Sequence, residues 1–422
     1  MKNFCFKTGP RSAYLHIPFC HRRCFYCDFV VVPIGDNPKN GTDFKIAEAI
    51  NTYLDLIHRE ISLVKETFPL STIYIGGGTP SLLSASQVEA LINHLRDHFG
   101  IQPGAEITLE VDPASFYYSD LIGFIQAGVN RISLGVQSFD DQVLKKIGRT
   151  HKYVDIIQAC EWIKTAYDDQ KLISWSLDLI QGLPGENIAY WQKQLEIASL
   201  INSPHLSVYE LTVEPGTVFD LRNKRGLLNL PSDKESYEMN RITSTYLSQI
   251  GYSRYEISSY ALPNHLSRHN RVYWGGAGWW GFGLGATSSP WGKRFTRPNS
   301  INDYAKWIDI QARECLHYSL LSSASSPMDL DESIMVGLRK REGIDLEMLS
   351  IEWGWDYKQR RIFIPLLLKR WKLAIDKGWI IHAGNRFRLS NPDGMDFSNQ
   401  VLIEMFVWWE SLPENAALPS SY

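Results

Sequence analysis

Short apolar runs rich in β-branched residues alternate along the chain with longer stretches whose apolar residues recur every three or four positions. The short runs predict buried strands, and the longer stretches predict helices with one apolar face. The expected strands are 13–17, 72–75, 106–111, 131–136, 173–180 and 205–211. The expected helices include 44–68, 86–99, 142–147, 154–166 and 190–201.

Polar residues and glycines mark several of these helix ends. Ser84, Ser86, Asp140 and Asn187 offer side-chain acceptors near helix starts, where the first backbone N–H groups need partners. Gly128 and Gly251 follow helical patterns at points where a left-handed residue ends a helix. The alternation of strand and helix therefore predicts right-handed βαβ units and a parallel sheet.

Six strands are too few for a closed eight-stranded barrel, so the pattern favours an α/β fold of the partial (β/α)6 barrel type or an open sheet. In both architectures functional residues gather at the carboxyl ends of the strands. The unusual loops of this chain fall at those ends: HIPFC, GGGTPS, DP, QSF and QGLPGE follow successive predicted strands.

The pattern changes after the sixth predicted strand. Residues 258–298 are rich in Gly, Trp, Tyr and His, and 322–327 (SSASSP) predicts a loop or linker. Helical patterns follow, and then two short strands, 380–383 and 386–389, joined by a Gly-Asn turn. We therefore expect a partial barrel in residues 1–315, including the 258–298 segment, and a small helical winged-helix-like domain in 328–422.

Composition narrows the class of protein. The 422 residues contain 44% hydrophobic residues, which favours two domains, and the net charge of −3 argues against nucleic acid as a partner. The amino-terminal residues lack a signal-peptide run, and no stretch of about 18 apolar residues predicts a membrane span. The six cysteines do not form an evenly spread disulfide framework, so we expect a cytoplasmic protein.

Three of those cysteines, Cys20, Cys24 and Cys27, lie within the stretch HIPFCHRRCFYCDF. Three thiolates would leave one metal position without a protein ligand. A structural zinc site completed by His16 or His21 is one interpretation. A [4Fe–4S] cluster with one open iron is the other, and it fits better because a second ligand pair at zinc spacing is missing.

The spacing C-x3-C-x2-C directly after a first strand resembles the radical S-adenosylmethionine (SAM) superfamily. The resemblance implies a [4Fe–4S] cluster on Cys20, Cys24 and Cys27, with SAM chelated to the open iron and cleaved to a 5′-deoxyadenosyl radical. Tyr26, between the second and third cysteine, matches the aromatic residue usual in that loop.

The strand-end motifs GGGTPSLL, EVDP, GVQSF, GRTH and DLIQGLPGE resemble, in order and context, those of the coproporphyrinogen dehydrogenase group. Taken alone, each polar residue in these motifs could equally be exposed to water or hydrogen-bonded within the core, without a ligand. Pairing between Arg149 and Asp178 also stays open. The resemblance implies SAM contacts from Tyr14, Gly77, Gly78, Thr79, Glu110, Gln137, Arg149, Asp178 and Thr212.

Two departures argue against the dehydrogenase activity itself. Those enzymes carry a fourth cysteine, which Phe29 replaces here, and a longer segment before the first cysteine. The run His269-Asn270-Arg271-Val272-Tyr273-Trp274 instead matches the HNxxYW motif of the HemW family of haem chaperones.

That second resemblance implies a haem site built from His269, Asn270, Tyr273 and Trp274, because imidazole ligates haem iron and aromatic faces suit a porphyrin. His265 is an alternative ligand. A packed aromatic loop without haem, in which His269 is hydrogen-bonded in place, is the alternative structure.

We expect a haem chaperone that binds haem and passes it to an acceptor haemoprotein, on a scaffold holding a [4Fe–4S] cluster and SAM. The alternatives are an oxygen-independent coproporphyrinogen III dehydrogenase, forming protoporphyrinogen IX, and a zinc protein without radical chemistry. An electron donor, a homodimer and a peripheral membrane contact through the acceptor stay open as further partners.

Overall fold

The computed structural model describes residues 9–35, 44–292, 294–314 and 328–417. Its main sheet has nine strands in the order β11-β1-β4-β5-β6-β7-β8-β10-β9. The six expected strands are all present and run parallel to one another. They are β1 (Ser12–Ile17), β4 (Leu70–Gly77), β5 (Ile101–Val111), β6 (Arg131–Gln137), β7 (Ser174–Gln181) and β8 (His205–Glu210).

Three short strands extend this sheet at its two ends. Strand β11 (Trp280–Phe282) pairs in parallel with β1, whereas β10 (Ser259–Ala261) and β9 (Ser253–Arg254) continue beyond β8 in antiparallel order. A separate parallel pair, β2 (Phe19–Cys20) and β3 (Val32–Pro33), closes the cysteine loop at its base. The predicted partial α/β barrel is therefore confirmed.

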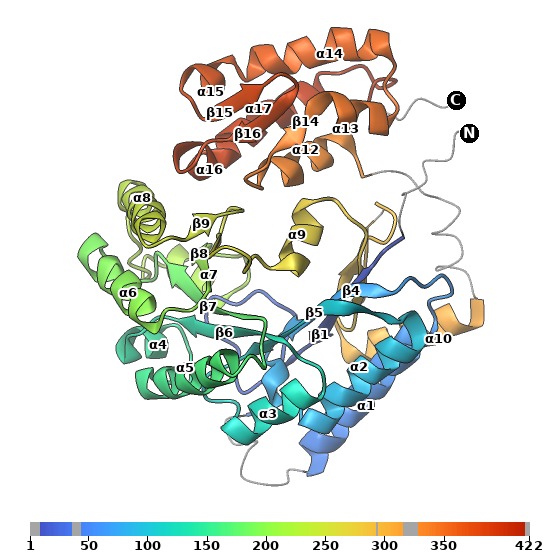
Figure 1. The fold of residues 1–422 in the computed structure, drawn as a ribbon, viewed down its shortest axis with the longest axis vertical. Helices are drawn as coiled ribbons and strands as arrows, with labels where there is room; N and C mark the ends of the chain where they lie inside the picture. Colours follow the sequence, from blue (N-terminus) through green and yellow to red (C-terminus); the bar gives the residue numbers. More distant parts are fainter. Residues whose placement is uncertain (1–8, 36–43, 293, 315–327, 418–422) are drawn as a thin grey trace.

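Helices follow the parallel strands and pack on the outer face of the curved sheet (Figure 1). They are α1 (Phe44–Ser62), α2 (Ala85–Phe99), α3 (Tyr118–Gln126), α4 (Asp141–Lys146), α5 (Tyr153–Asp168), α6 (Ile188–Ile201), α7 (Val218–Lys224) and α8 (Asp233–Gln249). A 3-10 turn spans Pro80–Leu82.

The expected helix ends are mostly confirmed. Ser84, Asp140 and Asn187 accept hydrogen bonds from the first turns of α2, α4 and α6. The expectation for Ser86 is wrong, because it lies inside α2, one position past the helix start. Gly128 and Gly251 adopt φ angles of 113° and 93°, as the end of a helix requires.

The segment after β10 contains α9 (Arg268–Trp274), the antiparallel pair β12 (Thr287–Ser288) and β13 (Phe295–Thr296), and α10 (Ile301–Glu314). Helix α9 lies between the sheet and the carboxyl-terminal elements (Figure 1). Helix α9 carries the HNRVYW motif, and α10 packs against α1 on the outer side of the sheet.

The carboxyl-terminal elements are mostly helical. They are α12 (Leu330–Leu338), β14 (Ile344–Asp345), α13 (Leu346–Trp353), α14 (Tyr357–Arg370), α15 (Lys372–Asp376), β15 (Ile380–Ala383), β16 (Arg386–Leu389), α16 (Asp393–Asp396) and α17 (Ser398–Glu410). The predicted hairpin of β15 and β16 is confirmed, and β14 adds a third antiparallel strand beside β16.

The buried hydrophobic residues form two clusters. One runs from Ala13 to Ile308, and the other from Leu330 to Ala416. The predicted linker at 322–327 lies outside the described residues, and the domain limits at 315 and 328 stay a prediction. Of the helices that the structure describes, none is long and apolar enough to cross a membrane.

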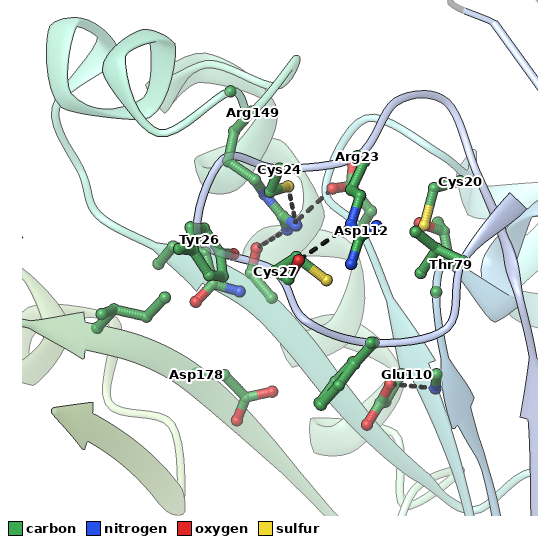
Figure 2. A pocket seen from close by; sticks show the side chains of 18 of the residues that line it. Cys20, Arg23, Cys24, Tyr26, Cys27, Thr79, Glu110, Asp112, Arg149 and Asp178 are labelled. Carbon is green, nitrogen blue, oxygen red and sulfur yellow. Dashed lines mark hydrogen bonds and ion pairs between the residues drawn. The ribbon is translucent and has the colours of Figure 1, made fainter. Parts of the chain in front are cut away.

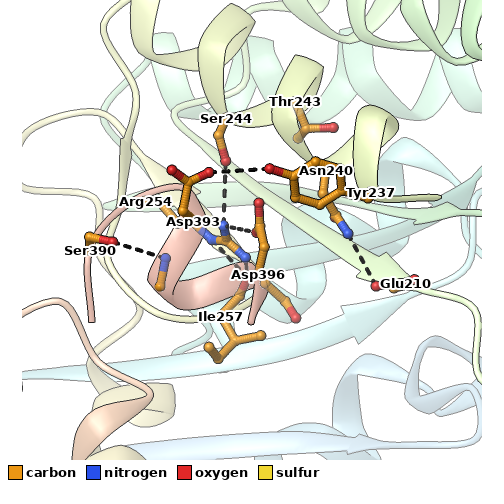
Figure 3. A network of polar contacts seen from close by, with 12 residues as sticks. Glu210, Tyr237, Asn240, Thr243, Ser244, Arg254, Ile257, Ser390, Asp393 and Asp396 are labelled. Atoms are coloured by element: carbon orange, nitrogen blue, oxygen red, sulfur yellow. Dashed lines mark hydrogen bonds and ion pairs between the residues drawn. The ribbon is translucent and has the colours of Figure 1, made fainter. Parts of the chain in front are cut away.

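A buried polar junction joins the two clusters (Figure 3). Arg254 on β9 donates to Asp396 on α16 at 2.7 Å, and both side chains are almost fully buried. Tyr237 on α8 donates to Asp393 at 3.4 Å beside this pair. The carboxyl-terminal elements are thus bonded directly to the strand edge next to β10.

Candidate functional site

A cavity of about 400 Å³ opens at the carboxyl ends of the parallel strands (Figure 2). This volume lies in the range of about 300–1,000 Å³ that is usual for small-molecule sites. The cavity wall includes most of the residues that the motifs predicted: Cys20, Cys24, Tyr26, Cys27, Gly77, Gly78, Thr79, Glu110, Gln137, Arg149, Asp178 and Thr212. The structure therefore brings the strand-end motifs into one wall.

Cys20 ends β2, and Cys24 and Cys27 lie in the loop between β2 and β3. Figure 2 shows Cys24 beside Arg149 and Cys20 beside Thr79, and the Arg149 guanidinium donates to the Cys24 sulfur at 3.7 Å. Burial raises the pKa of the Cys20 thiol to about 12 and also raises the pKa of Cys27. Such thiols stay protonated unless a cation compensates their charge, as an iron–sulfur cluster would.

Among the described residues, no set of three or more His, Cys, Asp or Glu side chains is already arranged around a metal position. The cysteine loop is nevertheless held in place, since the backbone N–H of Phe25 donates to Ile147 at 2.9 Å and Phe219 donates to Phe25 at 3.0 Å. The three thiols share one cavity wall, and this donor set fits a cluster with one open iron after a local adjustment of the loop.

Two glycines after β4 allow this loop to approach the sheet. Gly77 has a φ of 117°, and a Cβ there would lie 2.6 Å from the His16 ring. A Cβ on Gly78 would lie 2.8 Å from the Cys20 sulfur and 2.7 Å from the Phe19 carbonyl oxygen. Both positions therefore need glycine for the chain to pack against the cysteine loop.

Glu110, at the end of β5, lies deep in the cavity. Its carboxylate accepts hydrogen bonds from the Gly77 backbone N–H at 2.9 Å and the Tyr74 hydroxyl at 2.8 Å. Burial raises its pKa to about 7, and these two hydrogen bonds only partly oppose that effect. A polar ligand that donates to Glu110 would stabilise the charged form further.

Arg149 pairs with Asp112, so the suggested pairing with Asp178 is wrong. The guanidinium of Arg149 lies 3.0 Å from the Asp112 carboxylate and donates to the Gly135 carbonyl at 2.8 Å. The carboxylate also contacts His151 at 3.2 Å. Burial works against the charge of Asp112, but Arg149 and His151 outweigh it and hold the Asp112 pKa well below its usual range.

Asp178 is bonded to serines instead of a cation. It accepts from Ser133 at 2.7 Å and from Ser176 at 3.4 Å, and burial raises its pKa. Gln137 lines the cavity with a φ of 66°, a left-handed conformation that is uncommon for a residue with a side chain. Such strain is frequent at ligand sites.

Tyr14 and the HNRVYW segment lie outside this cavity wall. The Tyr14 hydroxyl contacts His16 Nδ1 at 2.9 Å, and the Tyr14 ring packs on Tyr74.

His269 is 1% exposed, and its two ring nitrogens contact the Thr72 hydroxyl and the Tyr273 hydroxyl, each at 2.8 Å. Burial lowers the His269 pKa to about 3. In this arrangement neither His269 nitrogen is free to bind iron.

Residues near His269 in the sequence also form hydrogen bonds and ion pairs within the protein. His265 contacts Ser174 at 3.2 Å and Tyr167 at 3.3 Å, and Arg271 forms an ion pair with Glu342. Trp274 lies under the Arg339 guanidinium, 5.9 Å from its ring centre. A Cβ on Gly278 would lie 2.1 Å from the Pro290 carbonyl oxygen, so this glycine serves close backbone packing. The segment therefore has the geometry of a packed aromatic loop.

A zinc site completed by His16 is not supported by this geometry, because His16 Nε2 donates to the Val30 carbonyl at 2.8 Å and Nδ1 contacts Tyr14. Cys160 is buried in the main core, as expected for a structural cysteine, while Cys5 and Cys315 lie outside the described residues.

Asp112 and Tyr209 are among the wall residues that the sequence analysis did not single out. Asp112 stands in the EVDP motif, and Tyr209 occupies a cavity-facing place in the sixth strand, so strand-end position alone could have pointed to both.

Comparison with known proteins agrees with this geometry. Residues 14–197 match the model of the radical SAM superfamily. The chain is 36% identical to the haem chaperone HemW of Synechocystis sp. over 94% of this chain and 96% of that protein. It is 35% identical to the haem chaperone HemW of Lactococcus lactis over 83% of this chain and 87% of that protein.

Among solved structures, the coproporphyrinogen III oxidase HemN of Escherichia coli superposes with a TM-score of 0.74 at 21% identity, covering 95% of this chain and 91% of that chain. At this identity the likeness supports the fold alone. The sequence similarity over nearly the whole length, together with the match of residues 14–197, shows that the chain belongs to the HemW haem chaperone family of the radical SAM superfamily.

Proposed function

We propose that Cys20, Cys24 and Cys27 hold a [4Fe–4S] cluster and that the adjoining cavity binds SAM. Membership of the radical SAM superfamily supports both cofactors. The cavity adds chemical support, because it combines thiols, a glycine-bordered backbone edge and the buried carboxylates of Glu110 and Asp178. Carboxylates in such a place can accept hydrogen bonds from ribose hydroxyls, and a strained Gln137 beside them is typical of a ligand wall.

Haem is the proposed cargo. The chain would bind haem and pass it to an acceptor haemoprotein in the cytoplasm. The observation that carries this proposal is the similarity to curated haem chaperones along 94% of the chain. The sequence Cys27-Asp28-Phe29 supports it over porphyrinogen oxidation, because the fourth cysteine of the dehydrogenase group is replaced. An electron donor for the cluster, a homodimer and membrane contact through the acceptor rest on the family resemblance alone.

A transfer experiment tests the proposal. The anaerobically purified protein is loaded with hemin, freed of excess hemin and mixed with an apo-haemoprotein, with apomyoglobin as a generic acceptor. We expect the absorption spectrum to change to that of the acceptor's haem complex. A parallel anaerobic incubation with coproporphyrinogen III, SAM and dithionite should yield no protoporphyrinogen. Protoporphyrinogen formation without hemin transfer would replace the chaperone by the dehydrogenase.

A further inference from the structure

The hydrogen bonds of His269 fix which of its ring nitrogens carries the proton. The Thr72 hydroxyl donates to the Ser12 hydroxyl at 2.9 Å, so it accepts from His269 Nδ1 at 2.8 Å. Neutral His269 then has its lone pair on Nε2, and the Tyr273 hydroxyl donates to that lone pair at 2.8 Å. The nitrogen that a metal needs is therefore present and covered by a hydroxyl group.

This tautomer is the one that a metal-ligating histidine has. Such a histidine donates its other ring N–H to a fixed oxygen, which orients the ring and makes the ligating nitrogen a stronger base. Thr72 supplies a fixed oxygen, because it lies on β4 and is 2% exposed. Haem iron already has four porphyrin nitrogens and takes an imidazole as an axial ligand. His269 thus has the proton arrangement of an axial ligand before any haem is bound.

Two further contacts keep the His269 ring from turning. The ring stacks on Tyr74 at a centroid distance of 5.1 Å and an interplanar angle of 28°. The His269 backbone N–H donates to the Glu106 carboxylate at 2.9 Å. Together with Thr72 these contacts come from β4 and β5, so the sheet sets the direction of Nε2. A ligand must therefore reach Nε2 where it stands.

Tyr273 is held less firmly than Thr72. It lies on the same helix as His269, four positions further along, and its side chain is half-buried whereas Thr72 is buried. Its ring makes edge contacts with His269 and Trp279. The hydroxyl that covers Nε2 therefore belongs to a side chain that already reaches the surface.

The two hydrogen bonds of His269 differ in what it costs to break them. Tyr273 can bond to water when it leaves Nε2, so the loss is the net value of one hydrogen bond, about two- to ten-fold in an equilibrium constant. Separating Nδ1 from Thr72 would leave a buried N–H group without an acceptor, which costs more. Iron binding at Nε2 therefore displaces Tyr273 and keeps Thr72 in place.

His265, the alternative ligand from the sequence, provides a comparison. Its ring nitrogens contact Ser174 at 3.2 Å and Tyr167 at 3.3 Å, and both distances are longer than the 2.8 Å contacts of His269. His265 also precedes α9 instead of lying in it. The pair of Tyr167 and His265 thus has the same two chemical groups in a looser contact.

We infer that Thr72 and Tyr273 are positioning residues for haem capture by His269: Thr72 holds the imidazole proton on Nδ1, and the Tyr273 hydroxyl is a cap that leaves Nε2 when iron binds. One hydrogen bond breaks and one iron–nitrogen bond forms, while the protons stay on the Tyr273 oxygen and on Nδ1. This inference rests on the proposed haem function and adds how the ligand is kept ready. A cap suits a carrier, because the returning hydroxyl competes with iron and favours release to the acceptor.

Hemin titration followed in the Soret band tests the cap, with the full chain purified anaerobically. The proteins are wild type, Tyr273→Phe, and Tyr167→Phe as the matched change at His265. We expect Tyr273→Phe to bind hemin about two- to ten-fold more tightly than wild type and to release it more slowly to apomyoglobin, because the cap no longer competes. Tyr167→Phe should match wild type. An unchanged or weaker affinity of Tyr273→Phe would overturn the cap.

Resonance Raman spectroscopy of the reduced, photolysed carbon monoxide complex tests Thr72. Thr72→Val removes the acceptor of His269 Nδ1, so it should lower hemin affinity about ten-fold or more and shift the iron–histidine stretching band to lower frequency. Thr72→Ser keeps the oxygen and should restore both. An unchanged band in Thr72→Val, or a band that persists in His269→Ala, would overturn the inference and leave the haem function standing. Absence of saturable hemin binding by wild type would overturn the haem function itself.

Discussion

Glu110 is a carboxylate whose ionisation opposes folding of the ligand-free protein. Burial raises its pKa to about 7, against about 4.3 for an unfolded chain. Because the folded state prefers the protonated form, stability from this group is present below the unfolded pKa and is lost as pH rises through about 7. Water in the cavity reaches one side of the Glu110 carboxylate. The loss of stability on ionisation is therefore smaller than it would be for a fully buried group.

Glu110→Gln should therefore stabilise the ligand-free protein at alkaline pH. We expect the advantage of the variant in free energy of unfolding to grow by about 1–2 kcal/mol between pH 5 and pH 8. Urea denaturation of both proteins at the two pH values measures it. A constant difference between the proteins would show that Glu110 is ionised throughout this range.

Each cysteine of the loop is required for the proposed cluster. Cys27→Ala should lower the iron content of anaerobically reconstituted protein from about four atoms per chain to well below one, because two thiolates hold a cubane poorly. Cys160→Ala is the matched control, since Cys160 is buried in the main core and away from the cavity wall. Iron and sulfide analysis decides the matter, and an unchanged iron content in Cys27→Ala would remove Cys27 from the cluster.

Sequence motifs could identify individual wall residues but not their partners. Cys20 and Glu110 were predicted because each stands at a strand end, and strand ends converge in a parallel sheet. Arg149 was predicted from the GRTH motif, which follows α4. Pairing of Arg149 with Asp178 was left open, but Arg149 pairs with Asp112, which directly follows β5, whereas Asp178 lies inside β7. The motifs name both carboxylates and do not show which of them the guanidinium reaches. The contact between His269 and Thr72 joins positions 197 residues apart, which periodicity does not reveal.

At the scale of elements, the start of helix α9 is held by a buried carboxylate as well as by its Ser267 cap. Glu106, at the start of the regular part of β5, accepts from the backbone N–H groups of Arg268 at 3.0 Å and His269 at 2.9 Å. These are first-turn donors without partners inside the helix. Since Glu106 is 2% exposed, water does not replace it easily.

Glu106→Ala should cost about 2–4 kcal/mol in free energy of unfolding, because it leaves buried N–H groups unpaired and opens a small cavity. Urea denaturation measures the loss, and Glu89→Ala on the exposed side of α2 is the control, expected within about 0.5 kcal/mol of wild type. A cost near zero for Glu106→Ala would mean that α9 is held by other contacts.

Elements with clear periodicity were predicted, and elements held by tertiary contacts were not. The six parallel strands and the hairpin of β15 and β16 have apolar or alternating runs bounded by turns. Helix α8 was missed because Thr243 and Ser244 are among the few residues it buries, so its apolar face is weak. Strands β9 and β11 are two and three residues long, and their pairing partners define them.

At the scale of the whole molecule, the two buried clusters are the basis for proposing two domains. The junction between them is partly ionic. Arg254 and Asp396 are about 5% and 2% exposed, whereas the pair of Arg271 and Glu342, which also links α9 to the carboxyl-terminal elements, is about half exposed. Both pairs cross the same junction, but one is buried and the other is in contact with water. Their contributions to the free energy of unfolding should therefore differ widely.

Arg254→Met should lower the free energy of unfolding by about 3–5 kcal/mol, because it leaves the Asp396 carboxylate buried without its cation. Asp396 Oδ2 already lacks a hydrogen-bond partner, and burial raises the Asp396 pKa. Arg271→Ala should cost only about 0–1 kcal/mol. The double change Arg254→Met/Asp396→Leu should recover much of the loss, since both charges are then gone. Urea denaturation compares the four proteins, and equal effects of Arg254→Met and Arg271→Ala would mean that the junction opens to water in solution.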